Sequence, residues 1–196
     1  MQIRKRTKIR KQQIIEIIRN IISSKGIEYV TISEIANRIG TTKTAIYRHF
    51  KSKRDILSLL IDNIEETLME KLDSSVTSDD PIQNLKNTLF AHLTYARERR
   101  ETSFIVIMGA MQFSDTIIRH KISLLIQKYL RKIGKILTNA IKQGLVRKDI
   151  DPRIAAISFL GLIQSTVTVW SYKNFNFTPK KTHGVLWSVY MQGISA

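Results

Sequence analysis

The sequence contains no cysteine and only three prolines, and its acidic side chains are half as many as its basic ones. Without cysteine there is no disulfide, thiolate metal site or cysteine nucleophile. The 16 Asp and Glu residues face 32 Lys and Arg residues, which leaves a formal net charge of +16. A surplus of this size predicts an anionic partner, either nucleic acid or an acidic membrane surface.

Long apolar runs and catalytic motifs are also missing. The most apolar window, residues 154–170, contains Ser, Thr and Gln and is short for a membrane span, so we predict a buried helix there. The four histidines are scattered without metal-ligand spacing, and no Gly-rich phosphate loop, G-x-S-x-G or H-E-x-x-H occurs. We expect a cytoplasmic protein that is not an enzyme and has no signal peptide, metal, cofactor or membrane partner.

The positive charge is concentrated near the N-terminus. Residues 1–54 hold 14 basic and three acidic side chains, whereas the remaining residues hold 18 and 13. We therefore predict a basic N-terminal domain at 1–52, with nucleic acid as its first candidate partner, and a second domain at 53–196. A peripheral membrane role for the basic segment is the alternative, but residues 8–25 offer no aromatic anchor.

Apolar residues recur with helical periodicity along the chain, and no run alternates as a strand would. Each proline follows Asp or Thr, a pairing typical of the first residues of a helix. The predicted fold is all-α with about nine helices, at residues 8–25, 31–39, 42–48, 52–72, 81–100, 103–112, 115–143, 152–172 and 179–193.

The segment TISEIANRIGTTKTAIYRHF, residues 31–50, places two short helices on either side of Gly40. Thr31 and Glu34 have the spacing of a capping box at the start of the first of these helices. The second is too short to be stable alone, yet it carries many polar side chains, while Ile46 and Phe50 can anchor its inner face. This pattern predicts a helix-turn-helix whose second helix enters the DNA major groove.

Individual contacts follow from side-chain chemistry. Lys43 is expected to donate to guanine O6 and N7, and Thr44 or Ala45 to lie against a thymine methyl. Backbone phosphates are the expected partners of Thr31, Thr42, Tyr47, His49 and Lys53. The alternatives are structural: Tyr47 can cover the first helix, His49 can be a structural histidine, and both threonines cap helices in either case.

The string from Ile14 to Leu60 closely resembles the DNA-binding domain of the TetR family of transcriptional regulators. Its most diagnostic part is YRHFKSK, residues 47–53, whereas Thr41 stands where the family usually has an apolar residue. The resemblance implies an all-helical C-terminal domain that forms a homodimer, usually binds a small molecule and usually serves repression.

The residues of this second domain support the same expectation. The helix at 152–172 is apolar nearly all round, so it needs cover on more than one side, and we expect the helices within 152–193 to pair with their copies. Flexible and aromatic apolar residues suggest a pocket for a small hydrophobic ligand, although each can equally be ordinary core. The candidates are Phe90, Leu93, Phe104, Met108, Met111, Tyr129 and Trp170.

We therefore expect a homodimeric repressor that a small, largely hydrophobic ligand releases from an inverted-repeat operator in double-stranded DNA. It would act in the cytoplasm of a bacterial or archaeal cell, on the nucleoid. The alternative is an architectural or chromosome-organising DNA-binding protein with the same fold, a filled core and no small-molecule ligand.

Overall fold

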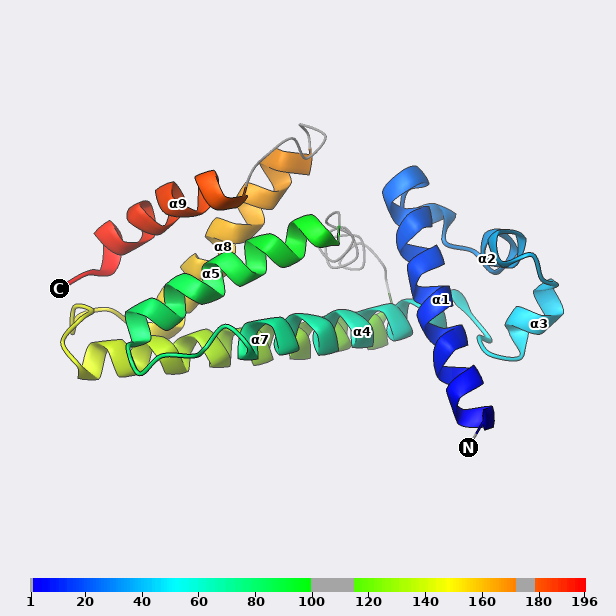
Figure 1. Ribbon diagram of the computed structural model, residues 1–196, viewed down its shortest axis with the longest axis horizontal. Coiled ribbons are helices and arrows are strands. Elements are labelled where there is room, and N and C mark those ends of the chain that lie inside the picture. Colours follow the sequence, from blue (N-terminus) through cyan, green and yellow to red (C-terminus); the bar gives the residue numbers. More distant parts are fainter. Residues whose placement is uncertain (1, 100–114, 172–178) are drawn as a thin grey trace. The chain divides into compact units, whose positions relative to one another are not determined.

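The structure is a computed structural model that describes the backbone of residues 2–99, 115–171 and 179–196. Every regular element within these ranges is helical, which confirms the predicted all-α class (Figure 1). The elements are α1 (Gln2–Lys25), the 3-10 helix η1 (Ile27–Tyr29), α2 (Ile32–Ile39), α3 (Lys43–Tyr47), α4 (Lys53–Asp73), α5 (Pro81–Glu98), α7 (Thr116–Lys142), α8 (Pro152–Ser171) and α9 (Pro179–Ile194). The helix predicted at 103–112 lies outside the described residues.

Local signals explain most helix boundaries. The Asp80 carboxylate accepts a hydrogen bond from the backbone N–H of Ile82 at 2.8 Å, and Pro81 occupies the first turn of α5. Gly144 adopts a φ of 71° just beyond α7, a conformation that favours glycine. The exception is α1, which begins at Gln2 rather than near residue 8, because residues 2–7 contain no helix breaker.

The described chain divides into two compact units. Unit 1 comprises Met1–Ile64 and the described part of Thr102–Ile122, and unit 2 comprises the described residues of Glu65–Glu101 and Ser123–Ala196. Both α4 and α7 contribute residues to each unit. In unit 1, α2 packs against α1 and α3. The buried core of this unit is rich in isoleucine and includes Ile14, Ile18, Ile21, Ile22, Ile35, Ile46 and Ile56.

In unit 2, α5 packs against both α8 and α9, and α8 also contacts α9 (Figure 1). A hydrogen bond also joins α8 and α9, because the Tyr190 hydroxyl donates to the backbone carbonyl of Ala155 at 2.9 Å. The Tyr190 ring also meets Phe159 edge to face. The fully buried side chains of this unit include Leu85, Leu89, Leu93, Ile133, Leu137 and Phe159.

Helix α8 is long and apolar enough to cross a membrane by length and composition alone, a test that core helices of soluble proteins also pass. One of its faces is buried in unit 2 through Ala155, Ala156, Phe159, Ile163, Val167 and Trp170. Its other face carries exposed Ile154, Ile157 and Val169. The predicted burial of this helix is therefore correct for one face only.

Candidate nucleic-acid interface

The first helix of the helix-turn-helix, α2, is held at both of its ends. At its start, the Thr31 hydroxyl oxygen accepts a hydrogen bond from the backbone N–H of Glu34 at 3.1 Å. At its end, Gly40 adopts a left-handed φ of 72°, and the N–H of Thr41 donates to the carbonyl of Ala36. The sequence TISEIANRIG therefore forms a short helix with a defined direction of exit toward α3.

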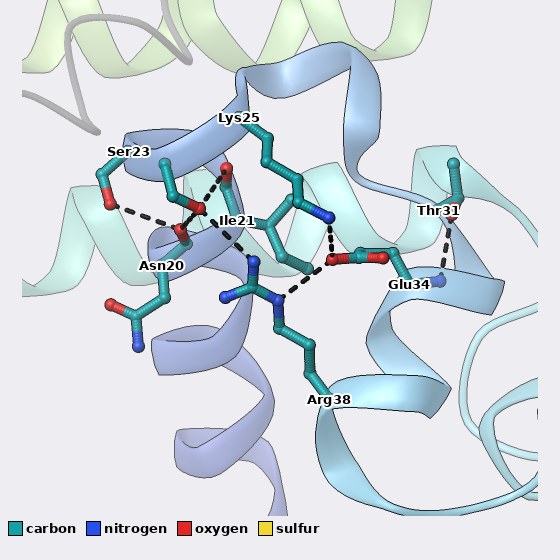
Figure 2. A network of polar contacts seen from close by, with 8 residues as sticks. Asn20, Ile21, Ser23, Lys25, Thr31, Glu34 and Arg38 are labelled. Carbon is teal, nitrogen blue, oxygen red and sulfur yellow. Dashed lines mark hydrogen bonds and ion pairs between the residues drawn. The ribbon is translucent and has the colours of Figure 1, made fainter.

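A small ionic network ties α2 to the end of α1 (Figure 2). The Glu34 carboxylate accepts from Lys25 Nζ at 2.9 Å and from Arg38 Nε at 3.1 Å, and Arg38 also donates to Ser24 Oγ at 3.4 Å. Hydrogen bonds from Lys25 and then Arg38 lower the pKa of Glu34. The capping pattern predicted that Glu34 would stay beside Thr31; instead its carboxylate joins two helices.

The second helix, α3, presents polar side chains to solvent on all but one side. Thr42 caps it by accepting from the N–H of Ala45 at 3.2 Å. Ile46 is the buried residue of α3, and Phe50 is buried just beyond it. The exposed residues are Thr42, Lys43, Thr44, Tyr47, Arg48 and His49. Five of the seven predicted DNA-contacting residues thus lie on one short exposed segment.

The hydroxyl groups of the two capping threonines can still donate a hydrogen bond. Thr31 and Thr42 use oxygen lone pairs to accept from the backbone, so the hydroxyl hydrogen of each stays able to donate to an anion. Both residues are exposed, and each stands at the start of its helix. The structure is compatible with phosphate contacts at both positions.

The start of α4 has its own capping box. Asp55 accepts from the backbone N–H groups of Lys51 and Ser52 at 2.7 and 3.2 Å, and Ser52 Oγ accepts from the N–H of Asp55. Lys53 in the same turn donates from Nζ to the carbonyls of Ile27 at 3.2 Å and Glu28 at 3.4 Å. Its half-buried ammonium thereby joins α4 to η1, a structural role that the sequence did not reveal.

Desolvation lowers the pKa of Lys53, with a partial offset from Glu28. Lys53 remains a candidate for a phosphate contact, with its ammonium already bonded within unit 1. Arg48 and Lys51 are exposed on either side of His49 and Phe50. They add positive charge to the same surface.

The predicted ligand-binding residues differ in how deeply they are buried. Leu93, Tyr129 and Trp170 are buried in unit 2. Phe90 is 42% exposed, and its ring meets that of His183 on α9 edge to face, with ring centroids 5.4 Å apart. Phe104, Met108 and Met111 lie outside the described residues. Three of the candidates are therefore buried, one on each of α5, α7 and α8, whereas Phe90 lies at the surface.

A polar pair lies within this largely apolar region. His92 Nδ1 and the Tyr129 hydroxyl are 3.0 Å apart, and their rings are tilted with centroids separated by 5.2 Å. Desolvation lowers the pKa of His92 to about 4, so the imidazole is neutral at physiological pH. Burial also raises the pKa of the Tyr129 hydroxyl, which stays protonated. Sequence reasoning missed His92, because its partner is 37 residues away.

Apolar side chains gather on the outer surface of α8 and α9. Ile154, Ile157 and Val169 of α8 are between 52% and 60% exposed, and Val185 and Val189 of α9 are 66% and 57% exposed. A shallow groove of about 560 Å³ runs beside them, lined by residues that include Ile154, Leu162 and Val189. Such an apolar surface is typical of a protein–protein interface.

Both parts of the chain match known protein families. Residues 14–60 match the family model described as bacterial regulatory proteins of the tetR family, and residues 50–192 match the model of the C-terminal region of YsiA-like proteins. The fatty acid metabolism regulator protein of Bacillus subtilis is 28% identical over 166 residues, which cover 81% of each chain. The nucleoid occlusion factor SlmA of Vibrio atlanticus is 22% identical over 182 residues, 92% of this chain and 93% of its own.

Solved structures show the same fold. The regulator FadR from Bacillus subtilis, crystallised with stearoyl-CoA, superposes with a TM-score of 0.81 at 23% identity, over 93% of this chain and 98% of that one. A helix-turn-helix with an exposed second helix, followed by an all-helical second part, defines a DNA-binding transcriptional regulator. The chain belongs to the TetR family of these regulators. This family consists of regulators, not enzymes.

Proposed function

We propose that the protein is a homodimeric repressor that binds an inverted-repeat operator through α3 and leaves it when a small, largely hydrophobic ligand enters unit 2. The protein would work in the bacterial or archaeal cytoplasm, with 1–52 as its DNA-binding domain and 53–196 as its ligand-sensing and dimerisation domain. The observation that carries the DNA-binding part is the exposed polar surface of α3 over a buried Ile46 anchor.

Within this surface, Lys43 is proposed to read a base, because its flexible ammonium stands in the first turn of an exposed helix. Thr44 is proposed to meet a thymine methyl. Thr31, Thr42, Tyr47, His49 and Lys53 are proposed to bind phosphates, which fix the position of α3 without reading sequence. The exposed cations Arg48 and Lys51 would strengthen both specific and non-specific binding.

The dimer is proposed to form through the exposed apolar faces of α8 and α9. A two-fold interface is self-complementary, and two helices from each copy would bury these faces in a four-helix arrangement. Two copies would then present two α3 helices to half-sites about one DNA turn apart. Two such contacts would let a regulator whose recognition helix has five residues select an operator longer than one helix can read.

The ligand is proposed to be an acyl compound, and an acyl-CoA thioester is the class to test first. Two observations support it. The first is the set of buried residues Leu93, Tyr129 and Trp170, with the neutral His92 beside Tyr129. The second is the stearoyl-CoA bound in the FadR structure. Ligand entry can alter operator affinity only if the ligand binds one arrangement of the two units better than another. Helix α4, continuous from Lys53 to Asp73, is the element through which such a difference would reach α3.

The test is a map of chromosomal binding sites at physiological salt, followed by titration of the purified protein on the recovered DNA. Inverted repeats at a few promoters, and a rise in the dissociation constant with stearoyl-CoA but not with CoA alone, are expected. Dozens of sites without promoter bias and no response to acyl-CoA would favour the architectural alternative. The similarity to the nucleoid occlusion factor SlmA and the net charge of +16 give that alternative its support.

A further inference from the structure

A second binding site is suggested by a groove of about 620 Å³ in unit 2, between the C-terminal half of α7 and the segment that joins α4 to α5. Four cationic side chains of α7 line it: Lys128, Arg131, Lys132 and Lys135. Two carboxylates, Asp73 and Asp79, also line it, so the groove carries a surplus of positive charge. None of these residues belongs to the proposed operator-binding surface.

The spacing of these cations is unfavourable for the helix itself. Lys128 and Lys132 are four residues apart, as are Arg131 and Lys135, and Lys132 and Lys135 are three apart. Side chains at these spacings are neighbours on a helix surface, and like charges there destabilise it. Desolvation lowers the pKa of Lys132, and repulsion from Lys135 adds to that effect. A helix with this pattern gains from an anion that bridges the cations.

Only two of the four cations that line the groove form ion pairs with carboxylates of the described residues. Lys128 Nζ lies 2.7 Å from a carboxylate oxygen of Glu65, and Lys132 pairs with Asp73, both acids on α4. Arg131 and Lys135 are exposed and form no ion pair with any residue in the described ranges. They stand one helical turn apart on the wall of the groove.

The opposite wall is preformed. The buried Asn84 accepts from the N–H groups of Thr77 and Ser78 at 3.1 and 3.0 Å and donates to the Ser78 carbonyl at 2.6 Å. These three bonds fix the segment before α5 against its first turns. Amides of Asn139 and Gln143 add hydrogen-bonding groups to the lining. A ligand would therefore meet a wall that needs little ordering.

Apolar groups complete the groove, since Val76, Pro81 and Ile136 also line it. Its volume is in the range of small-molecule sites, roughly 300 to 1,000 Å³. The alternative is that these cations only form a solvated surface of α7. That alternative accounts for the charges but not for a groove that is also lined by apolar side chains. We propose that this groove binds a small molecule that carries a diphosphate attached to a largely apolar or aromatic group, with Arg131 and Lys135 holding the phosphates.

Adenosine diphosphate is the probe, with inorganic pyrophosphate and uncharged adenosine beside it, in titration calorimetry on the full-length protein. The informative variant is R131Q/K135Q. Its matched control is K142Q/K148Q, which removes two exposed cations from the same unit outside the groove lining. Circular dichroism and thermal unfolding verify that both variants fold, and loss of like-charge repulsion should leave R131Q/K135Q at least as stable as wild type.

The expected result is that ADP and pyrophosphate bind and adenosine alone does not. The dissociation constant for ADP should rise at least about tenfold in R131Q/K135Q and less than about twofold in K142Q/K148Q, since only the first pair touches the phosphates. Equal losses in the two variants would reveal a general effect of charge and overturn the site, as would failure of both phosphate probes to bind. Preference for a polyglutamate peptide over ADP, abolished by R131Q/K135Q, would also overturn it and assign the groove to an acidic protein segment.

Discussion

The Lys25 ammonium at the end of α1 lies 2.9 Å from the Glu34 carboxylate at the start of α2. The same carboxylate oxygen accepts from Arg38 one turn further along α2, so one acidic side chain receives two cations (Figure 2). This clamp fixes α2 against the helix that precedes it. Since α3 follows α2 after a short turn, the clamp also sets where the recognition helix points.

Replacing Glu34 with glutamine should lower the melting temperature, and the loss should shrink at high salt, because the pairs are exposed to solvent and screened. The pKa of Glu34 is lowered, so its stabilisation is present above the ordinary glutamate pKa and is lost as pH falls through the lowered one. Glu66→Gln is the control, since Glu66 is exposed and makes no ion pair within the described ranges. Equal, salt-independent losses in both variants would refute the clamp.

Replacing Lys43 with alanine should weaken operator binding by about 1 to 3 kcal/mol, roughly 5- to 160-fold, and reduce the preference for operator over scrambled DNA. Fluorescence anisotropy on both DNAs measures the two effects. Lys148→Ala removes the same charge from unit 2 and should change binding little. If Lys43→Ala weakens both DNAs equally, Lys43 binds a phosphate and not a base.

Tyr47→Phe isolates one hydroxyl of the same surface. Tyr47 is 54% exposed, so its ring is not needed to cover the core, and the phenylalanine variant should keep the melting temperature of wild type. Loss of a phosphate hydrogen bond should weaken operator and scrambled DNA to a similar extent. Unchanged binding of both DNAs would show that the Tyr47 hydroxyl makes no phosphate contact.

Much of the fold could be predicted because its signals are local. Asp80-Pro81 and Gly144 mark helix ends by backbone chemistry, which acts within a few residues of the chain. The caps by Thr31 and Thr42 were predictable for the same reason. The exposure of α3 could also be predicted from its sequence. A short helix that buries one residue must leave its other side chains in contact with solvent.

What could not be predicted depends on competition between partners and on contacts between helices. The capping pattern gives Glu34 a local partner, yet Lys25 and Arg38 offer charge-assisted bonds that outweigh it. Lys53 was expected to bind a phosphate, and nothing in the sequence indicated that its ammonium also donates to carbonyls 25 and 26 residues earlier. Phe90 has the apolar character of a pocket residue, but packing of α9 on α5 decides which way it faces.

Aspartate at Ile157 or Val185 should convert the protein to a monomer. Both side chains are more than half exposed on the outer faces of α8 and α9, so the charge is tolerated in the free chain and unpaired in the buried interface. Analytical ultracentrifugation measures the change, and operator affinity should fall with it, because one subunit reaches one half-site. Leu124→Asp, which replaces a 46% exposed side chain of α7 outside the proposed interface, should stay dimeric. Dimers in all three variants would place the interface elsewhere.

The pair of the partly buried His92 and the buried Tyr129 predicts a stability that falls in mild acid. The pKa of His92 is lowered to about 4, whereas the unfolded chain titrates near 6.5, so below pH 6.5 the unfolded state binds more protons than the folded one. Between these values unfolding should become easier by up to about 3 kcal/mol, at roughly 1.4 kcal/mol per pH unit. Denaturant titrations from pH 7 to pH 4 measure this dependence.

Comparison with His92→Gln separates this effect from the titration of carboxylates, which occurs in both proteins. Glutamine can still hydrogen-bond to the Tyr129 hydroxyl but carries no proton-binding ring, so the variant should lose less stability than wild type between pH 6.5 and pH 4. Identical slopes would show that the imidazole titrates as in the unfolded chain and is therefore open to water. A flatter slope together with a changed response to stearoyl-CoA is the outcome expected if this pair lies at the proposed ligand site.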